Sequence, residues 1–367
     1  MKKIPFVLFS FLLGCFLASL SAEIILRIYD PFEFRVKGNR IVLPVNKKYI
    51  ITNHKISKLD EKIVHTRNIL GFRGDNPPKS FPEDLTIVTI GGSTTECFFL
   101  SDGQTWPDLL DQKLKKVFHS LWLNNAGLDG QSTFGHLVLL RDYVAPLRPK
   151  VVLFLFGIND FILEQGNAND DTLTEDHWYY HSEFLTFLLN MRSYLLAKKM
   201  DITHNEIDLL TAEKFKVSIE YRNETLANLK QYGKLDGYAK RVTELVKICR
   251  ANGIEPVLIT QPSLYGDAID DITKVDLGSL RYHKVDSSTI WQIIEIYNDI
   301  TRDVGRAEHV PVVDLAREMP KSSRLFYDHI HFTPAGAQEV SAIVYRRLCP
   351  FLSERFHQYQ MNQCEIK

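Results

Sequence analysis

The chain has 367 residues, of which 45% are hydrophobic and 24% are charged, so it is an ordinary globular protein with a sizeable core. Its formal net charge is −1, and we therefore expect no nucleic-acid partner. The five cysteines have the spacing of neither a metal cluster nor a dense disulfide framework, although a bridge between Cys349 and Cys364 is conceivable.

A charge-free apolar segment stands at the N-terminus. Lys2 and Lys3 precede Ile4–Ala22, nineteen residues without a charge, and Glu23 follows directly. That length can cross a bilayer as a helix, and the two lysines favour a cytoplasmic start with the bulk of the chain outside, on the periplasmic or extracellular side. We predict a single-pass signal-anchor, or transmembrane segment, at residues 1–22.

Two other fates of this segment stay open. Cleavage near Ser21 or Ala22 would give a secreted protein. Lipidation at Cys15 is the second, because the four residues that end there resemble a bacterial lipobox, although the apolar run continues beyond them. The extreme N-terminal position and the flanking lysines argue against a buried core helix.

Residues 23–83 are mixed in character and predict an irregular juxtamembrane segment that leads into the domain and can pack on it. From residue 84 to about 355, apolar runs alternate with helical periodicity. Most of these runs are continuously apolar, as in strands that are covered on both faces of a parallel sheet. The predicted strands are 85–91, 121–125, 150–156, 254–260 and 309–314.

Helical spacing of apolar residues separates these strands. One helix is predicted from about 105 to 118, and another from about 237 to 252 with Gly253 as its C-terminal stop. Further helices are expected near 133–146, 288–304 and 335–348. The alternating order predicts an α/β fold, a three-layer domain over residues 84–355.

Residues 161–235 interrupt this alternation. They hold a polar loop, an aromatic cluster at 177–181 and charged, helix-prone stretches. Because this is long for a connection within a domain, we predict a helical insertion or a cap over the active site.

A serine stands directly after the first predicted strand, in the segment Gly-Gly-Ser-Thr-Thr-Glu at 91–96. Reactive groups in an open α/β sheet gather at the carboxyl ends of the strands. Gly91 and Gly92 can form a tight turn that exposes the Ser93 hydroxyl and turns the Ser93 N–H toward a developing oxyanion. Taken alone, the segment is explained equally well by a helix N-cap.

The ends of the next two strands can supply further hydrogen-bond donors. Gly127 can offer a backbone N–H, and Asn159 can offer a side-chain amide. With the Ser93 N–H they would make three donors for a tetrahedral intermediate, and one such donor typically contributes roughly 2.7–4 kcal/mol. Either segment alone is also what a simple turn would use.

Asp328 and His331 supply the remaining groups of a serine triad. Thr333 and Pro334 predict the start of a helix, so His331 lies in the loop before it and can reach Ser93 while Asp328 holds its other nitrogen. His329 could be mistaken for the base. A histidine pair could also indicate a metal site, but no matching ligand cluster appears elsewhere in the sequence, so no metal or other cofactor is expected.

In this order and spacing, the four segments resemble the four blocks of the SGNH (GDSL-like) hydrolase superfamily over roughly residues 84–350. The resemblance implies a flavodoxin-like sheet of five parallel strands. Many members have aspartate before the serine, where this chain has Gly92, and the variant found here is similar to that of membrane-anchored members. The resemblance implies these roles: nucleophile Ser93, general base His331, its partner Asp328, and oxyanion donors Ser93, Gly127 and Asn159.

These residues predict a membrane-anchored serine esterase that hydrolyses O-acyl esters, acetyl esters foremost, through an acyl-enzyme. The substrate would be a small-molecule or glycan ester. Trp178 and Tyr179 could stack on a sugar ring, and Gln261, after the fourth strand, could line the pocket. The aromatic residues are equally well explained by a helix that packs on the core.

Two other functions stay open. The same triad could serve a polysaccharide O-acetyltransferase, in which a sugar hydroxyl replaces water. An inactive SGNH-like domain could serve as a binding or assembly module, but the complete set of candidate residues argues against this. A lipase or thioesterase would also use this triad, and the oligomeric state is not indicated.

Overall fold

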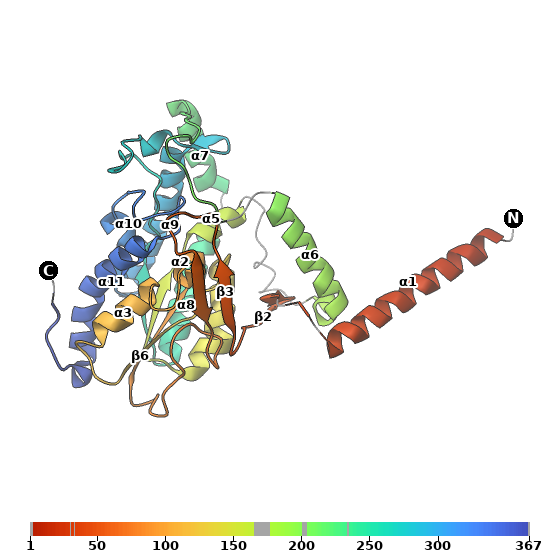
Figure 1. Cartoon of the computed structure of the whole chain (residues 1–367), viewed down its shortest axis with the longest axis horizontal. Coiled ribbons are helices and arrows are strands. Elements are labelled where there is room, and N and C mark those ends of the chain that lie inside the picture. The colour runs from red at the N-terminus through yellow and green to blue at the C-terminus, as the bar shows by residue number, and fades with distance from the viewer. Residues whose placement is uncertain are drawn as a thin grey trace. The chain divides into compact units, whose positions relative to one another are not determined.

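Figure 1 shows the computed structural model of the chain. The structure describes residues 3–29, 31–32, 34–164, 177–199, 204–232 and 235–365. Contacts between residues divide the chain into two compact units. The first unit comprises Met1–Pro44 with Asn169–Thr203, and the second comprises Val45–Ala168 with His204–Lys367.

A parallel sheet of five strands forms the centre of the second unit, in the order β11-β8-β7-β5-β6. The chain passes from β5 to β6 on one side and then back to β7 on the other, so the winding reverses beside β5. The strands are β5 (Leu85–Gly91), β6 (Leu121–Asn125), β7 (Val151–Leu155), β8 (Glu255–Ile259) and β11 (Val312–Val313). The predicted α/β fold with five parallel strands is confirmed.

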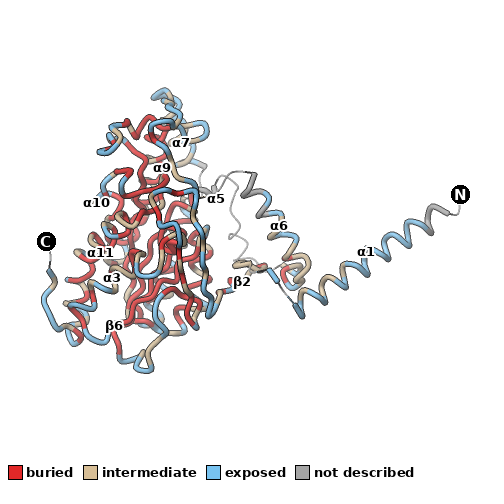
Figure 2. Tube along the Cα trace, in the orientation of Figure 1, coloured by how far each residue is buried: buried red, intermediate tan, exposed pale blue. Residues whose placement is uncertain are grey.

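Helices cover this sheet in two groups. α3 and α11 pack on each other, and α3 also contacts β6, whereas α8 contacts both α4 and α9. Every residue of β5, β6 and β7 is buried, and Figure 2 shows buried segments in red through the interior of this part of the chain. Both faces of these strands are therefore covered, which explains their continuously apolar sequences. The helices are α3 (Trp106–Leu114), α4 (Thr133–Leu139), α8 (Leu235–Ala251), α9 (Ser287–Ala307) and α11 (Pro334–Arg355).

Local sequence explains where these helices begin. Thr105 caps α3 through reciprocal hydrogen bonds with Asp108. Thr333 caps α11, and Pro334 occupies its first position, as the sequence predicts. The loop that carries Asp328 and His331 therefore ends at a fixed point.

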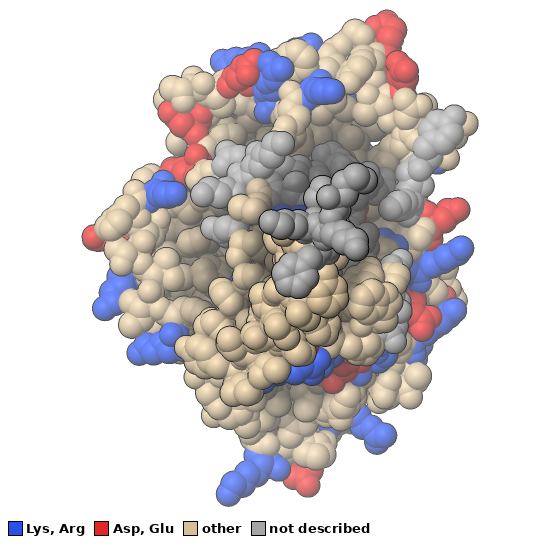
Figure 3. All heavy atoms as spheres, turned by 90° about the vertical axis from the view of Figure 1, so that its right-hand side faces the viewer, with Lys and Arg blue, Asp and Glu red and all other residues tan. Residues whose placement is uncertain are grey.

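Shorter elements complete the second unit, including two antiparallel strand pairs, β3 with β4 and β9 with β10. Charged residues of both signs are scattered over the face that Figure 3 shows, in agreement with the near-zero net charge. The elements are β3 (Lys48–Thr52), β4 (Lys62–Thr66), α2 (Ser93–Glu96), η1 (Leu140–Val144), η2 (Ala145–Leu147), α5 (Ile158–Glu164), α7 (Ile219–Tyr232), η5 (Leu277–Ser279), β9 (Arg281–Tyr282), β10 (Val285–Asp286), α10 (Leu315–Glu318) and η6 (His357–Tyr359).

Residues 45–83 belong to the second unit, so this part of the predicted juxtamembrane segment at 23–83 folds with the domain into which it leads. Arg73 shows the physical reason. This side chain is 1% exposed, and its guanidinium donates to the carbonyl oxygens of Glu96 and Cys97 at 2.9 and 2.8 Å. A buried cation held in this way fixes the segment to the loop that follows Ser93's helix.

The first unit contains α1 (Lys3–Ile28), β1 (Val36–Lys37), β2 (Arg40–Ile41), the short helix η4 (Trp178–His181) and α6 (Glu183–Lys199). Within α1, Val7–Ile28 has a mean hydropathy of 2.0 and is not buried. In the described part of the chain it is the one helix long and apolar enough to cross a membrane, and a signal sequence meets the same criteria.

The predicted insertion at 161–235 is divided between the two units. η4 and α6 belong to the first unit, and α7 belongs to the second. Residues 165–176, 200–203 and 233–234 lie outside the described residues.

A disulfide joins Cys349, within α11, to Cys364 near the C-terminus. Of the free cysteines in the described chain, Cys15 is exposed on α1, whereas Cys97 and Cys249 are buried. Burial raises the pKa of both buried thiols to about 12, so they remain protonated at neutral pH.

Candidate active site

Ser93 begins α2, two residues after β5 ends at Gly91. No side chain fits at either glycine before it. A Cβ on Gly91 would lie 2.5 Å from the Leu155 carbonyl oxygen, and a Cβ on Gly92 would lie 2.5 Å from the Asn159 amide nitrogen. The close approach of β7 and Asn159 therefore explains why this chain has glycine immediately before the serine.

Two distant parts of the sequence meet at this turn, one with Ser93 and the other with Asp328 and His331. His331 Nε2 lies 2.8 Å from Ser93 Oγ, and His331 Nδ1 lies 2.6 Å from Asp328 Oδ2. The other Asp328 oxygen accepts the backbone N–H groups of Ile330 and His331 at 2.9 and 2.8 Å. Asp328 thus orients both the imidazole ring and the loop that carries it.

The charge of Asp328 determines which imidazole nitrogen can act as a base. Burial opposes ionisation of this carboxyl, but the charge and hydrogen bonds of His331 outweigh it and hold the pKa of Asp328 well below its usual value. An ionised Asp328 accepts the Nδ1–H of His331, which leaves Nε2 free to accept the Ser93 proton. The arrangement can therefore activate the hydroxyl as a nucleophile.

Asn159 lies beside Ser93, in the first turn of α5. Its side-chain amide donates to the Gln131 carbonyl oxygen at 2.7 Å and lies against Gly92. The next residue, Asp160, fixes this turn. Its carboxylate accepts the Thr133 N–H at 3.1 Å and pairs with Arg241 at 3.1 Å.

Gly127 departs from the prediction. Its N–H donates to Asn125 Oδ1 at 2.9 Å, and a Cβ there would lie 2.5 Å from the Glu96 nitrogen. This N–H is thus engaged beneath α2 and is not available to an oxyanion. Gly130 differs, because it is exposed and a Cβ there would meet nothing within 4 Å.

A buried ion pair stabilises the position of α2. Glu96, at the end of α2, pairs with Arg67, and both side chains are at most 2% exposed. The second Glu96 oxygen accepts the backbone N–H of Asp129. Glu96 therefore joins the serine turn to the segment that follows β6.

His204 is a site residue that the sequence analysis did not identify. Its ring centroid lies 4.2 Å from that of His331. His204 Nδ1 is 2.7 Å from the Tyr327 hydroxyl, and Nε2 is 3.4 Å from Asp129 Oδ2. Part of the predicted insertion at 161–235 thus reaches the triad.

The charge of His204 depends on its acidic neighbours. Burial lowers its pKa, but the hydrogen bond and charge of Asp129, together with the charges of Asp328 and Glu96, raise the pKa above its usual value. His204, Asp328 and His331 also present ligand atoms within 4.8 Å of one another, a grouping that could hold a metal ion. In the structure, Asp328 and His331 are hydrogen-bonded to each other, and His331 is also hydrogen-bonded to Ser93.

Other residues expected at the site lie elsewhere. Gln261 is 1% exposed and accepts the Thr94 hydroxyl at 3.2 Å, so it supports the serine turn from within instead of lining a pocket. The ring of His329 stacks on Tyr265, with 5.1 Å between centroids. Trp178 and Tyr179 are in the first unit, so their predicted contact with substrate stays a prediction.

Residues 89–339 match the GDSL-like lipase/acylhydrolase family. No curated protein matches the chain. Among solved structures, the chain is similar to the acetylxylan esterase Axe2 from Geobacillus stearothermophilus, with 14% identity over 72% of this chain and 93% of that one and a TM-score of 0.43. It is also similar to the lipase/acylhydrolase from Enterococcus faecalis, with 18% identity over 74% and 96% and a TM-score of 0.40.

Proposed function

The chain belongs to the GDSL-like lipase/acylhydrolase family and is a carboxylic ester hydrolase, and on that premise we propose that it is a membrane-anchored serine esterase with Ser93 as its nucleophile. The observation that supports this most is the unbroken chain of short contacts from Asp328 through His331 to Ser93. Ser93 begins α2, whereas Asp328 and His331 lie in the loop before α11, and a helix N-cap alone would not require these contacts.

The reaction follows from these contacts. His331 Nε2 takes the proton of Ser93 as Oγ attacks the ester carbonyl, and Asp328 stabilises the imidazolium that forms. The imidazolium then gives its proton to the departing alcohol, which leaves an acyl group on Ser93. Water attacks this acyl-enzyme with His331 again as base, and the acid is released.

Three donors would stabilise the negative oxygen in both steps. These are the Ser93 N–H, the Asn159 amide and the Gly130 N–H, which replaces Gly127. Gly130 is exposed and directly precedes Gln131, whose carbonyl binds the Asn159 amide, so the two donors belong to one continuous surface. Losing one donor of this kind typically slows the reaction by roughly 10²–10³.

We further propose that α1 anchors the enzyme and that the second unit works outside the cytoplasm. Lys2 and Lys3 precede the apolar run, which favours that orientation. An enzyme held there would meet envelope glycans and exported esters. The proposed substrates are accordingly O-acetyl esters, with acetylated carbohydrate as the favoured class.

The experiment is a rate comparison over nitrophenyl esters of increasing chain length and an acetylated oligosaccharide. The acetyl ester should be hydrolysed fastest, and Ser93→Ala should lower kcat on the order of 10⁴-fold or more. Asn159→Ala, which removes the proposed amide donor, should slow turnover by roughly 10²–10³-fold, whereas Gly103→Ala, at an exposed glycine, should not. Preference for long acyl chains would refute the acetyl assignment, and an active Ser93→Ala would refute the nucleophile.

The same assay separates hydrolysis from acyl transfer. With a sugar acceptor present, a hydrolase releases one molecule of acetate for each molecule of alcohol that leaves the ester. An acetyltransferase instead moves the acetyl group to the sugar, which mass analysis of the acceptor would detect.

A further inference from the structure

The first unit is fastened together where α1 ends. The Glu23 carboxylate accepts the Ser182 hydroxyl at 2.8 Å and the backbone N–H groups of Glu183 and Phe184 at 3.2 and 2.9 Å. It therefore caps the N-terminus of α6 from another helix. Arg27 binds Glu23 at 2.7 Å and donates to the His181 carbonyl oxygen at 2.6 Å.

These polar contacts, here called the junction, lie directly after the charge-free run of α1. From Ile4 to Ala22 the chain carries no charge, and Glu23 and Arg27 are the first charged residues after that run. Charged side chains are costly inside the hydrocarbon region and are favoured where it meets water. If α1 spans the bilayer, η4 and the start of α6 are therefore held at the membrane surface.

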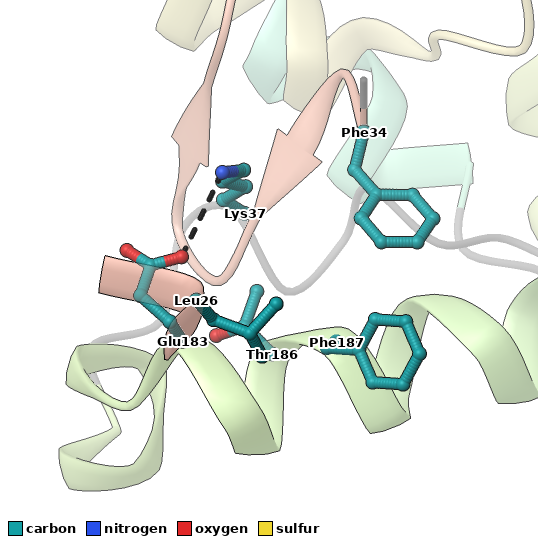
Figure 4. Close-up of a pocket in the computed structure, with 6 residues that line it drawn as sticks. All are labelled: Leu26, Phe34, Lys37, Glu183, Thr186 and Phe187. Atoms are coloured by element: carbon teal, nitrogen blue, oxygen red, sulfur yellow. Dashed lines mark ion pairs between the residues drawn. The ribbon is translucent and has the colours of Figure 1, made fainter. Parts of the chain in front are cut away.

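The antiparallel pair of β1 and β2, here called the hairpin, also belongs to this junction. The Asn190 amide donates to the Val36 carbonyl oxygen at 2.9 Å, and Lys37 pairs with Glu183 at 3.7 Å. Figure 4 shows this pair beside the pocket between the hairpin and α6, where Phe34 faces Phe187 across the pocket. The junction is thus built from several contacts and is more than a chance approach of two helices.

Apolar side chains remain uncovered around this junction. Exposed leucines occur along α6. Leu188 and Leu189 on α6 are 45% and 37% exposed, whereas Trp178 in η4 is 78% exposed and Tyr29 after α1 is 69% exposed. We call these four residues the collar.

We propose that the collar is a membrane-contact surface that sits in the headgroup region of the bilayer beside α1. This inference rests on the anchoring role proposed for α1. A bilayer is favoured as the partner because Tyr29 directly follows α1, whose apolar segment Val7–Ile28 is not buried in the described structure. Trp and Tyr are also the residues that prefer this interface.

Basic residues near the collar are also compatible with a bilayer as the partner. The Arg27 and Arg40 side chains are 56% and 64% exposed, so each can reach lipid phosphates from the level of the collar. The chain crosses between the two units three times, after Pro44, Ala168 and Thr203. A seated collar would therefore hold the catalytic unit to the membrane by three connections instead of one.

The test uses the full-length protein in nanodiscs whose lipids carry a spin-label quencher either near the headgroup or at the bilayer centre. Trp178 is observed as the difference in fluorescence between the wild type and Trp178→Phe. Trp122→Phe is the matched control, because Trp122 is 4% exposed and lies in the second unit. A fluorophore on Cys15, the exposed free cysteine of α1, reports on the anchor separately.

The Cys15 label should be quenched most by the bilayer-centre lipid. Trp178 should be quenched several-fold more by the headgroup-level lipid than by the bilayer-centre lipid, and iodide in the water should have little effect on it. Trp122→Phe should leave that lipid-dependent quenching unchanged.

Two results would overturn the proposal in different ways. Quenching at Cys15 with Trp178 responding to iodide alone, or to neither quencher, would refute the collar and leave the anchor intact. No quenching at Cys15 in nanodiscs would refute the anchor and the collar with it.

Discussion

Replacing His204 with glutamine should move the acid limb of the esterase pH profile to lower pH. The reaction places a positive charge on His331, whose ring centroid is 4.2 Å from that of His204. Two unit charges about 4 Å apart repel by about 4 kcal/mol at an effective dielectric constant of about 20. A protonated His204 would thus slow formation of the imidazolium by up to about 10³-fold.

The direction of this shift in the pH profile follows from the groups around His204. Asp129, Asp328 and Glu96 raise its pKa against the effect of burial, so His204 gains its positive charge at a higher pH than an ordinary histidine. The wild type therefore loses activity as pH falls through that raised pKa. In His204→Gln this charge cannot form, so the acid limb should move to lower pH.

The assay is kcat/KM for a nitrophenyl acetate from pH 5 to pH 9. His119→Gln is the matched control, because His119 is an exposed histidine that binds Ser120 and the Gln358 carbonyl oxygen. Its profile should coincide with that of the wild type. If the acid limb of His204→Gln also coincides with the wild type, the electrostatic reasoning is wrong.

Three further predictions concern stability. Glu96→Gln should lower the free energy of unfolding by about 3–5 kcal/mol in urea titrations, because the buried cation of Arg67 would face a neutral amide in place of a carboxylate; a loss below about 1 kcal/mol would contradict this. Burial lowers the pKa of His136 to about 3, whereas its pKa in the unfolded chain is near the usual 6.5. Below pH 6.5 the unfolded chain therefore takes up a proton that the folded protein does not, and the free energy of unfolding falls. At pH 5 the loss in the free energy of unfolding should be about 2 kcal/mol. His136→Leu should make the free energy of unfolding depend less on pH, and an equal pH dependence in wild type and variant would contradict this. Reducing the Cys349–Cys364 bridge, whose sequence separation is 15, should lower the free energy of unfolding by about 3 kcal/mol, and a double alanine variant should show the same loss without reductant.

The sheet and the candidate triad could be predicted because their signals are local. Continuous apolar runs indicate strands covered on both faces, and Ser93 stands just after such a strand. Asp328 and His331 stand close together in the loop before a helix whose start is marked by Thr333 and Pro334.

The remaining features depend on contacts between distant residues. Nothing in the residues around His204 indicates that its ring packs on His331. Gly127 could be excluded as a donor only by its hydrogen bond to Asn125. Residues 45–83 have an irregular pattern in sequence, and their place in the second unit is explained by buried arginines such as Arg73.

Covalent labelling tests the central claim most directly. A fluorophosphonate should react with the folded wild type at one site, and peptide mapping by mass spectrometry should locate the adduct on Ser93. Ser93→Ala should not react, and His331→Ala should react far more slowly because the hydroxyl loses its base. A folded wild type that does not react, or that carries the adduct on another residue, would contradict the account.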